Sequence, residues 1–183
     1  ISSRNNQILQ NDKQSTANTL KANGVLSIHS GWWHHANNSQ MQGGAVHLKS
    51  NGSNLNLGSG NSSLKALSNP VLKNDAKLKS LDGSINIEAK SDVYIQPGYT
   101  VAADGNFHLK AGNKLTLAGK SGNKGNPSAT TSTLSAKGEI KLIAGEADIQ
   151  AAKIAAGKDL TVGTTKGQLN IAGLRNAFSD YSS

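Results

Sequence analysis

Short apolar-polar-apolar triplets recur along the chain, as at residues 85–87, 93–95 and 140–142. In an extended strand, alternate side chains point to opposite faces, so each triplet predicts a strand with one buried face and one exposed face. Glycines and Asp-Gly pairs lie between many of the triplets. Both are typical of the corners between strands, where they supply positive φ angles. The pattern predicts an all-β chain of many short strands.

The triplets repeat at a nearly constant distance. When the sequence is aligned with itself after a fixed shift, Ile85 aligns with Phe107 and Val93 aligns with Leu115. A slightly shorter shift pairs Leu26 with Val46, Ile28 with Leu48, Leu134 with Ile154, Ile140 with Leu160, Ile149 with Leu169, and Ile154 with Leu174. Three short strands per unit cannot form a core alone, whereas stacked units cover one another. We therefore predict a parallel right-handed β-helix, a β-solenoid, with about 20–22 residues per coil.

An antiparallel sandwich or barrel could use the same short strands, but it would not require a constant unit length. We expect a single β-helix domain over residues 1–183, interrupted by irregular insertions at 29–43, 61–80 and 119–133. The stretch from Leu48 to Ile87 is long enough for about two units. Because the chain begins without an initiator Met, we interpret it as a fragment of a longer chain.

The composition narrows the function classes. Lysine and arginine number 19 against 11 acidic residues, which gives a net charge of +8, yet only 16% of residues are charged. Cysteine is absent, so neither a disulfide framework nor a thiolate metal site is expected. No apolar stretch approaches the ~20 residues of a membrane span, so we expect no membrane insertion. A glycine-lysine-serine sequence at 119–121 lacks the upstream glycine of a phosphate-binding loop, and we expect no cofactor.

One segment concentrates aromatic residues and histidines: Trp32, Trp33, His34 and His35 follow one another in the predicted insertion 29–43. Tryptophan supplies rigid apolar area, so the segment is a candidate recognition patch. The alternative is that a tryptophan packs over a coil edge and the histidines are solvated. A zinc site would have to use His29, His34, His35 and His47. Because no carboxylate or cysteine lies near them in the sequence, we expect no metal site.

A run of lysines lies in the insertion 61–80 and consists of Lys65, Lys73, Lys77 and Lys79. It predicts a solvated basic surface that could attract an anionic glycan or lipopolysaccharide. We include Lys73, Lys77 and Lys79 in the candidate recognition patch. No aromatic residues alternate with these lysines as they do where proteins stack bases, so we expect no nucleic acid partner.

Acidic residues offer little support for catalysis. The stacking of units places Asp82 one coil from Asp104, and paired carboxylates can act as acid and base on polysaccharides. Each of the two precedes a glycine, however, where aspartate is an ordinary turn residue. We therefore expect no catalytic residues and no enzyme. The same stacking predicts opposite-charge neighbours on the outer face, namely Asp92 with Lys114 and Glu88 with Lys110.

Residues 136–173, with the pattern AKGEIKLIAGEADIQ…AAGKDLTVGTTKGQLNIAG, resemble the haemagglutinin repeats of filamentous haemagglutinin-like exoproteins. The pattern recurs at residues 81–119 and more faintly at 20–60. The proteins of this family are two-partner-secreted proteins of Gram-negative bacteria, including adhesins and the stalks of contact-dependent growth inhibition effectors. The resemblance implies a right-handed β-helix, secretion through an outer-membrane partner transporter, and an extracellular filament. The repeats of this family carry no catalytic residues.

From the resemblance we expect a structural or binding segment of a secreted bacterial surface filament, either an adhesin or the stalk that carries a toxin. A target-cell receptor or an anionic glycan would then be its partner. A carbohydrate-binding or carbohydrate-active β-helix is the alternative, and a groove lined by acids and aromatic residues would favour it. A third hypothesis makes the segments 29–43 and 61–80 the receptor-binding region itself.

Overall fold

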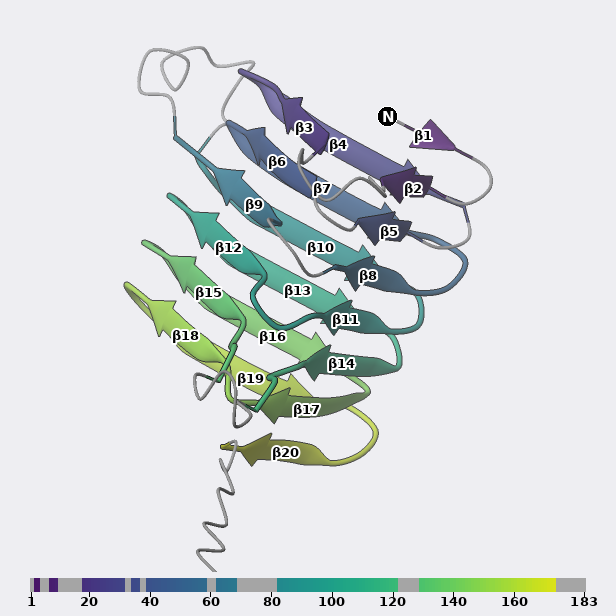
Figure 1. Ribbon diagram of the computed structural model, residues 1–183, viewed down its shortest axis with the longest axis vertical. Helices are drawn as coiled ribbons and strands as arrows, with labels where there is room; N and C mark the ends of the chain where they lie inside the picture. Colours follow the sequence, from purple (N-terminus) through teal and green to yellow (C-terminus); the bar gives the residue numbers. More distant parts are fainter. Residues whose placement is uncertain are drawn as a thin grey trace, which may run out of the picture.

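The computed structural model describes residues 2–3, 7–9, 18–31, 34–36, 39–58, 62–68, 82–121 and 129–173. These residues form strands and no helix. The strands make three sheets of seven, seven and six members, and every pair of neighbouring strands is parallel (Figure 1). The predicted all-β, parallel arrangement is therefore confirmed. Among the described residues, none belongs to a helix that is long and apolar enough to cross a membrane.

Each sheet takes one strand from every turn of the chain. Sheet A contains β1 (Ser2–Ser3), β4 (Val25–Ser30), β7 (Ala45–Ser50), β10 (Ile85–Ala89), β13 (Phe107–Ala111), β16 (Ile140–Ala144) and β19 (Leu160–Thr164). Sheet B contains β2 (Gln7–Leu9), β5 (His34–Ala36), β8 (Leu55–Leu57), β11 (Val93–Ile95), β14 (Lys114–Leu117), β17 (Glu146–Gln150) and β20 (Leu169–Ala172). Sheet C contains β3 (Asn18–Lys21), β6 (Ser39–Gly43), β9 (Ser63–Ala66), β12 (Thr100–Ala103), β15 (Thr133–Ala136) and β18 (Lys153–Ala156).

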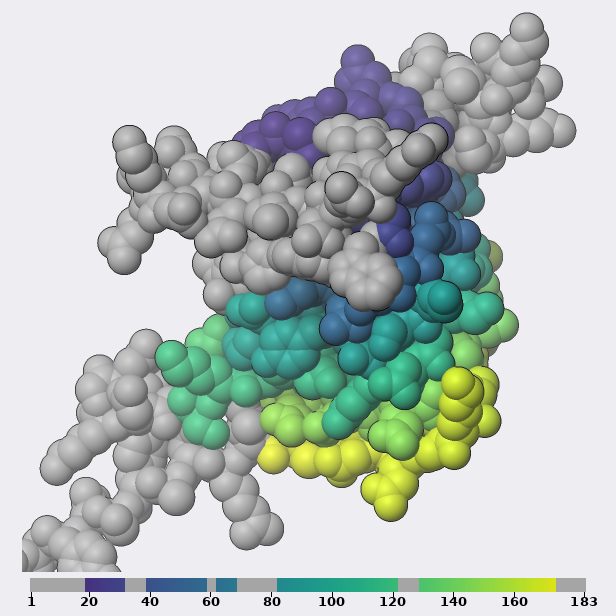
Figure 2. Space-filling view, turned by 90° about the vertical axis from the view of Figure 1, so that its right-hand side faces the viewer, coloured from purple at the N-terminus to yellow at the C-terminus, as the bar shows by residue number. Residues whose placement is uncertain are grey.

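The chain visits the three sheets in turn, so strands that are three apart in the numbering lie side by side. This is the arrangement of a parallel β-solenoid, in which each coil adds one strand to each sheet. Figure 2 shows the same order on the surface, where the colours change in bands from purple through teal to yellow along the vertical axis. Each coil therefore contacts the coil before it and the coil after it.

The register confirms most of the predicted stacking. Ile85 lies beside Phe107 and Val93 beside Leu115. The other confirmed pairs are Leu26 with Val46, Ile28 with Leu48, Leu134 with Ile154, and Ile140 with Leu160. The register of these pairs keeps apolar residues beside apolar residues on the inner face, whereas a slip by one residue would reverse every side chain.

One predicted pair is wrong. Ile149 lies beside Ile171, and Leu169 lies beside Ala147. Only Gly145 separates β16 from β17, whereas residues 165–168 separate β19 from β20. Because of this longer connection, the offset between partners is larger in sheet B than the offset between Ile140 and Leu160 in sheet A. The predicted pairing of Ile154 with Leu174 lies outside the described residues.

The stretch from Leu48 to Ile87 forms fewer coils than the sequence predicts. Leu48 pairs directly with Ile87, so the chain between them makes one turn and not two. In the predicted insertion 61–80, β9 pairs with β6 and β12, while residues 69–80 lie outside the described residues. The described strands between Leu48 and Ile87 thus add one coil, where the spacing suggested two.

The other two predicted insertions have different outcomes. Segment 29–43 is not an irregular insertion, because it holds the end of β4 together with β5 and β6, all paired in register. The polar composition of this segment concealed short strands whose partners lie in neighbouring coils. In segment 119–133, β14 ends before the segment at Leu117, β15 begins at Thr133, and an antiparallel bridge joins Lys120 to Thr130, while residues 122–128 lie outside the described residues.

Apolar ladders fill the interior of the solenoid. One ladder in sheet A consists of Val46, Ile85, Phe107 and Ile140, all fully buried. Burial of each such side chain contributes about 1.5–3 kcal/mol. Equivalent residues of sheets B and C complete the core. The stacking of identical faces therefore supplies the core that no single coil has.

One of the two Asp-Gly corners differs from the prediction. Gly83 has a φ of +79°, as expected for a corner that requires glycine. Gly105 is not in the positive-φ region, so that part of the prediction is wrong. Glycine is needed at Gly105 for space, because a Cβ there would lie 2.7 Å from the carbonyl oxygen of Asp82. Stacked corners approach each other closely, so glycine is required at this corner by close contact and not by a positive φ angle.

The last described coil has an uncovered face. Leu160 is 49% exposed and Ile171 is 65% exposed. Their partners in the preceding coil, Ile140 and Ile149, are 0% and 3% exposed. β18, β19 and β20 are the last strands of their sheets, as the lower end of Figure 1 shows. The inward side chains of this coil are therefore covered on one side only among the described residues.

Candidate functional site on the outer face of sheet A

Polar and charged side chains gather on the outer face of sheet A. Because Ile85 and Ile87 point into the core, the residues that alternate with them point outward. One outer row consists of Ser27, His47, Asn86, His108, Lys141 and Thr161. The parallel row consists of His29, Lys49, Glu88, Lys110, Ile143 and Gly163. Both rows run across the strands, along the stacking direction of the coils.

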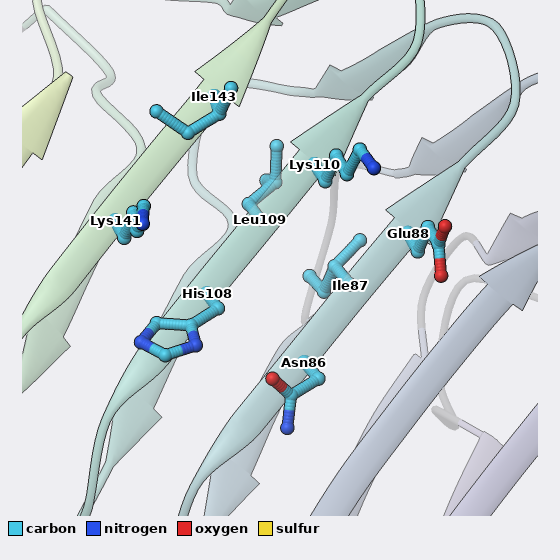
Figure 3. A pocket seen from close by; sticks show the side chains of 8 residues that line it. All are labelled: Asn86, Ile87, Glu88, His108, Leu109, Lys110, Lys141 and Ile143. Carbon is cyan, nitrogen blue, oxygen red and sulfur yellow. The ribbon is translucent and has the colours of Figure 1, made fainter. Parts of the chain in front are cut away.

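A hollow of about 450 Å³ lies over β10, β13 and β16 on this face. Figure 3 shows Asn86, His108 and Lys141 beside one another on the three strands. The other lining residues are Ile87, Glu88, Leu109, Lys110 and Ile143. A second hollow of about 320 Å³ adjoins it over β4, β7 and β10, and shares Asn86 and Glu88 with the first. The two hollows form a shallow track along the axis of the solenoid.

His108 is held at one edge of the first hollow. Its Nε2 atom lies 2.6 Å from Oε1 of Glu139, and each of the two side chains is 41% exposed. Glu139 precedes β16, and its backbone N–H donates to Oδ1 of Asn106 at 3.0 Å. The Glu139 carboxylate is thus already engaged by the imidazole, which forms an ion pair with it when protonated.

Glu88 is engaged as well, but not by the predicted partner. Glu88 and Lys110 are neighbours in register, as expected, yet the carboxylate pairs with Lys49 of the opposite neighbouring strand at 3.4 Å. A glutamate with lysines on both sides can form only the pair that its rotamer allows. The side chains of Lys110 and Lys141 are exposed and form no ion pair or hydrogen bond with any described residue. Two lysines at the first hollow are therefore without counter-ions among the described residues.

The aspartates at the corners have structural contacts. Asp104 lies 2.8 Å from Nζ of Lys137 and accepts a hydrogen bond from the backbone N–H of Ser68 at 3.0 Å. The hydrogen bond from Lys137 lowers the pKa of the Asp104 carboxyl below its ordinary value. Asp82 instead accepts from the backbone N–H of Ser84 at 2.9 Å. The two carboxylates therefore act separately in two corners and form no pair.

Asp92 and Lys114, predicted as opposite-charge neighbours, are joined by a hydrogen bond to the backbone instead of an ion pair. The Asp92 carboxylate accepts hydrogen bonds from the backbone N–H of Lys114 at 3.1 Å and from the side-chain amide of Asn113 at 2.7 Å. A corner carboxylate thus satisfies the backbone of the following coil. These bonds tie consecutive coils together through the main chain and leave the Lys114 ammonium out of the contact.

Tyr99 is a titratable group that the sequence did not single out. Its side chain is fully buried just before β12, and this burial raises the pKa of the phenol above its ordinary value. No described residue offers a hydrogen-bond partner to its hydroxyl. A phenol that stays neutral within the core fills space, and it has no access to a ligand.

Most of the predicted recognition patch lies outside the described residues, namely Trp32, Trp33, Lys73, Lys77 and Lys79. The backbones of His34 and His35 belong to β5, which pairs with β2 and β8. Lys65 lies on β9 and is exposed. Within the described part of the chain, no group of three or more histidines and acids could hold a metal ion.

The sheet A face is a candidate that sequence reasoning missed. Its signal was present in the outward positions of successive triplets, where His108, Lys110 and Lys141 occur in two adjacent coils. Comparisons with protein-family models, characterised proteins and solved structures found no match. Evidence for function therefore comes from the fold and from the side chains that it displays.

Proposed function

We propose that the chain is a structural and binding segment of a secreted bacterial surface filament, an adhesin or the stalk of a contact-dependent inhibition effector. In this proposal the solenoid is right-handed, with coils of about 20–22 residues that lengthen where insertions occur. Stacked ladders would hold a distal domain away from the cell, while the outer faces make specific contacts. The filament would lie on the surface of a Gram-negative bacterium.

The uncovered last coil is the observation that carries this proposal. Leu160, Leu169 and Ile171 are 49%, 42% and 65% exposed, although their sequence positions are those of core residues. A further coil stacked on β18, β19 and β20 would bury them and would pair the strand edges that no described strand pairs. An isolated domain would have to protect such an edge against aggregation. A segment within a longer rod needs no such protection.

The repeat pattern of residues 136–173 supports the route to the surface. Its resemblance to haemagglutinin repeats favours export through an outer-membrane partner transporter, followed by folding outside the cell. The absence of cysteine and the polar outer faces are compatible with this location. The partner at the far end would be a target-cell receptor or an anionic glycan.

Immunogold labelling tests the proposal. Antibodies against residues 82–173 are applied to intact cells that produce the full-length protein, and to cells in which the candidate transporter gene is deleted. We expect gold particles outside the outer membrane on intact cells and none on intact cells of the deletion strain. Labelling that appears only after permeabilisation of transporter-positive cells would contradict the proposal.

Carbohydrate binding is the second candidate, and the two adjoining hollows of sheet A favour it. Their mixed polar and apolar lining lies on an accessible sheet face that could contact an extended sugar chain. Carbohydrate cleavage has less support, because the carboxylates of Asp82 and Asp104 are engaged in separate corners.

A further inference from the structure

We propose that the outer face of sheet A binds an anionic polysaccharide along the solenoid axis, with Lys110 and Lys141 as its principal cationic contacts. This inference rests on the proposed function, since it names the ligand class of a surface-exposed segment. The site is the track formed by the two hollows over β4 to β16.

The charge distribution of the track favours an anion. Glu88 is paired with Lys49 at 3.4 Å, and Glu139 contacts His108 at 2.6 Å. Both carboxylates near the first hollow are thus engaged within the protein. Lys110 and Lys141 have no such counter-ion among the described residues and remain available. An anionic ligand would replace the missing counter-charges.

The positions of the two lysines favour a ligand with more than one charge. Lys141 pairs in register with His108, and Lys110 pairs with Ile143. The two lysines therefore occupy diagonal positions on neighbouring strands, with Cα atoms about 8 Å apart by strand geometry. Exposed single charges attract weakly in water and are screened by salt. Several charges on one chain act together through a high effective concentration, which favours a polymer.

The shape of the track favours a sugar polymer. The two hollows share Asn86 and Glu88, so a long ligand can pass from one to the other. The strands that line the track repeat at about 4.8 Å, which is comparable to the length of one sugar unit in an extended polysaccharide. Asn86 and His108 offer hydrogen-bonding groups for hydroxyls, and Ile143 offers an apolar surface for a sugar ring.

An acidic peptide is a poorer fit to the same face. Peptides bind sheets mainly by adding a strand to a free edge. Strands β7, β10, β13 and β16 of the track each have neighbours on both sides, so their edges are already paired. A peptide on this face would have only side-chain contacts. Poly-L-glutamate therefore serves as the probe for this alternative.

Isothermal titration with four polymers tests the inference: polygalacturonate for carboxylates, dextran sulfate for sulfate esters, dextran without charge, and poly-L-glutamate. We expect binding to polygalacturonate, to dextran sulfate or to both, which identifies the anionic group. Dextran should not bind, and poly-L-glutamate should bind at least roughly ten-fold more weakly than the preferred polysaccharide. Equal binding of poly-L-glutamate, or no binding of either anionic polysaccharide, would overturn the inference.

Matched variants separate the site from net charge. The variant Lys110→Gln/Lys141→Gln should lose roughly ten-fold or more in affinity for the preferred polysaccharide. The control Lys153→Gln/Lys158→Gln removes the same charge from exposed positions on β18 and just after it, and its loss should stay below about three-fold. Equal losses in both variants would overturn the inference.

Glu88→Gln provides a test in the opposite direction. This substitution frees Lys49 from its ion pair and removes a negative charge from the track, so affinity should rise. An unchanged or lower affinity would contradict a role for the track. Failure of these titrations leaves the immunogold result intact, so the binding inference and the proposed filament can fail separately.

Discussion

The middle coils and the last described coil have the same alternating pattern but different environments. Phe107 and Ile140 are fully buried between neighbours on both sides. Leu160 pairs with Ile140 in the same register, yet it is 49% exposed because no described strand covers its other side. The pattern of the sequence therefore determines which side chains point inward, whereas burial comes from the neighbouring coils.

This difference has an energetic consequence. A side chain in the middle coils gains the full transfer free energy of burial, about 1.5–3 kcal/mol, while one in the last coil gains only part of it. Local opening in proteins begins where few buried contacts hold the backbone. We therefore expect the solenoid to open from β18–β20 before the middle coils open.

The largest expected effect on stability comes from truncating a large side chain in the core. Phe107→Ala should lower the free energy of unfolding by about 3–5 kcal/mol, because it leaves a cavity between Ile85 and Ile140. The matched change Leu169→Ala, at a residue that is 42% exposed, should cost roughly 1 kcal/mol. Urea denaturation followed by circular dichroism measures both values. Similar losses of unfolding free energy for the two variants would contradict the expected difference between the middle coils and the last described coil.

The corners allow a second comparison. Gly105→Ala should cost about 1–3 kcal/mol, because the new Cβ would crowd the Asp82 carbonyl oxygen and the Ser84 hydroxyl oxygen of the preceding corner. Around Gly173, apart from its chain neighbours, no atom of the described residues lies within 4 Å of the position that a Cβ would take. Gly173→Ala should therefore change stability by less than about 0.5 kcal/mol. Differential scanning calorimetry should show a lower melting temperature for Gly105→Ala only.

A third test concerns pH. Because Lys137 lowers the pKa of Asp104 in the folded state, this ion pair stabilises the fold above the unfolded pKa of about 3.9. The contribution disappears as the pH falls from that value through the lowered folded pKa. Asp104→Asn should cost up to about 1 kcal/mol at neutral pH and less in acid, since Lys137 is exposed.

Asp159 of the last coil provides the control for this pH test. It is exposed and forms no ion pair with a described residue, so Asp159→Asn should leave the neutral-pH stability nearly unchanged. Denaturation curves at a series of pH values distinguish the two variants. A loss for Asp104→Asn that persists unchanged below the folded pKa would argue against the ion pair as its cause.

The smallest effect is expected on the outer face of the middle coils. A double-mutant cycle of Lys49→Ala and Glu88→Ala should give a coupling of about 0.2–1 kcal/mol that decreases with salt. A coupling of this size would show that charge pairs on the outer face stabilise these coils much less than burial of the inner ladders does. A coupling as large as the burial of a core side chain would mean that the outer charges are a principal source of stability.

The sequence predicts the interior of this fold better than its connections. Apolar alternation and the repeat length together place Ile85 beside Phe107, because a slip by one residue would turn the buried face outward. It fails for Ile149, which pairs with Ile171, because additional turn residues change the offset in one sheet only. The strands within 29–43 were missed for another reason: their pairing comes from neighbouring coils and not from their own composition.

The candidate site shows the limit of prediction more clearly. The register of Glu88 beside Lys110 follows from the repeat, but the choice of Lys49 as its partner depends on side-chain rotamers. That choice leaves Lys110 without a counter-ion within the described part of the chain, and the availability of this lysine defines the proposed track. Sequence reasoning favoured the conspicuous tryptophans and lysine run, whose described members are few. Paired and unpaired charges look alike in a sequence.

The variable length of the coils has a practical consequence. Neighbouring strands keep their in-register pairing whether the chain between partners is short, as from Ile140 to Leu160, or much longer, as from Leu48 to Ile87. A peptide inserted at the bridge between Lys120 and Thr130 should therefore leave the ladders on either side intact. The solenoid can serve as a grafting platform, in which foreign epitopes are displayed at chosen heights without redesign of the scaffold.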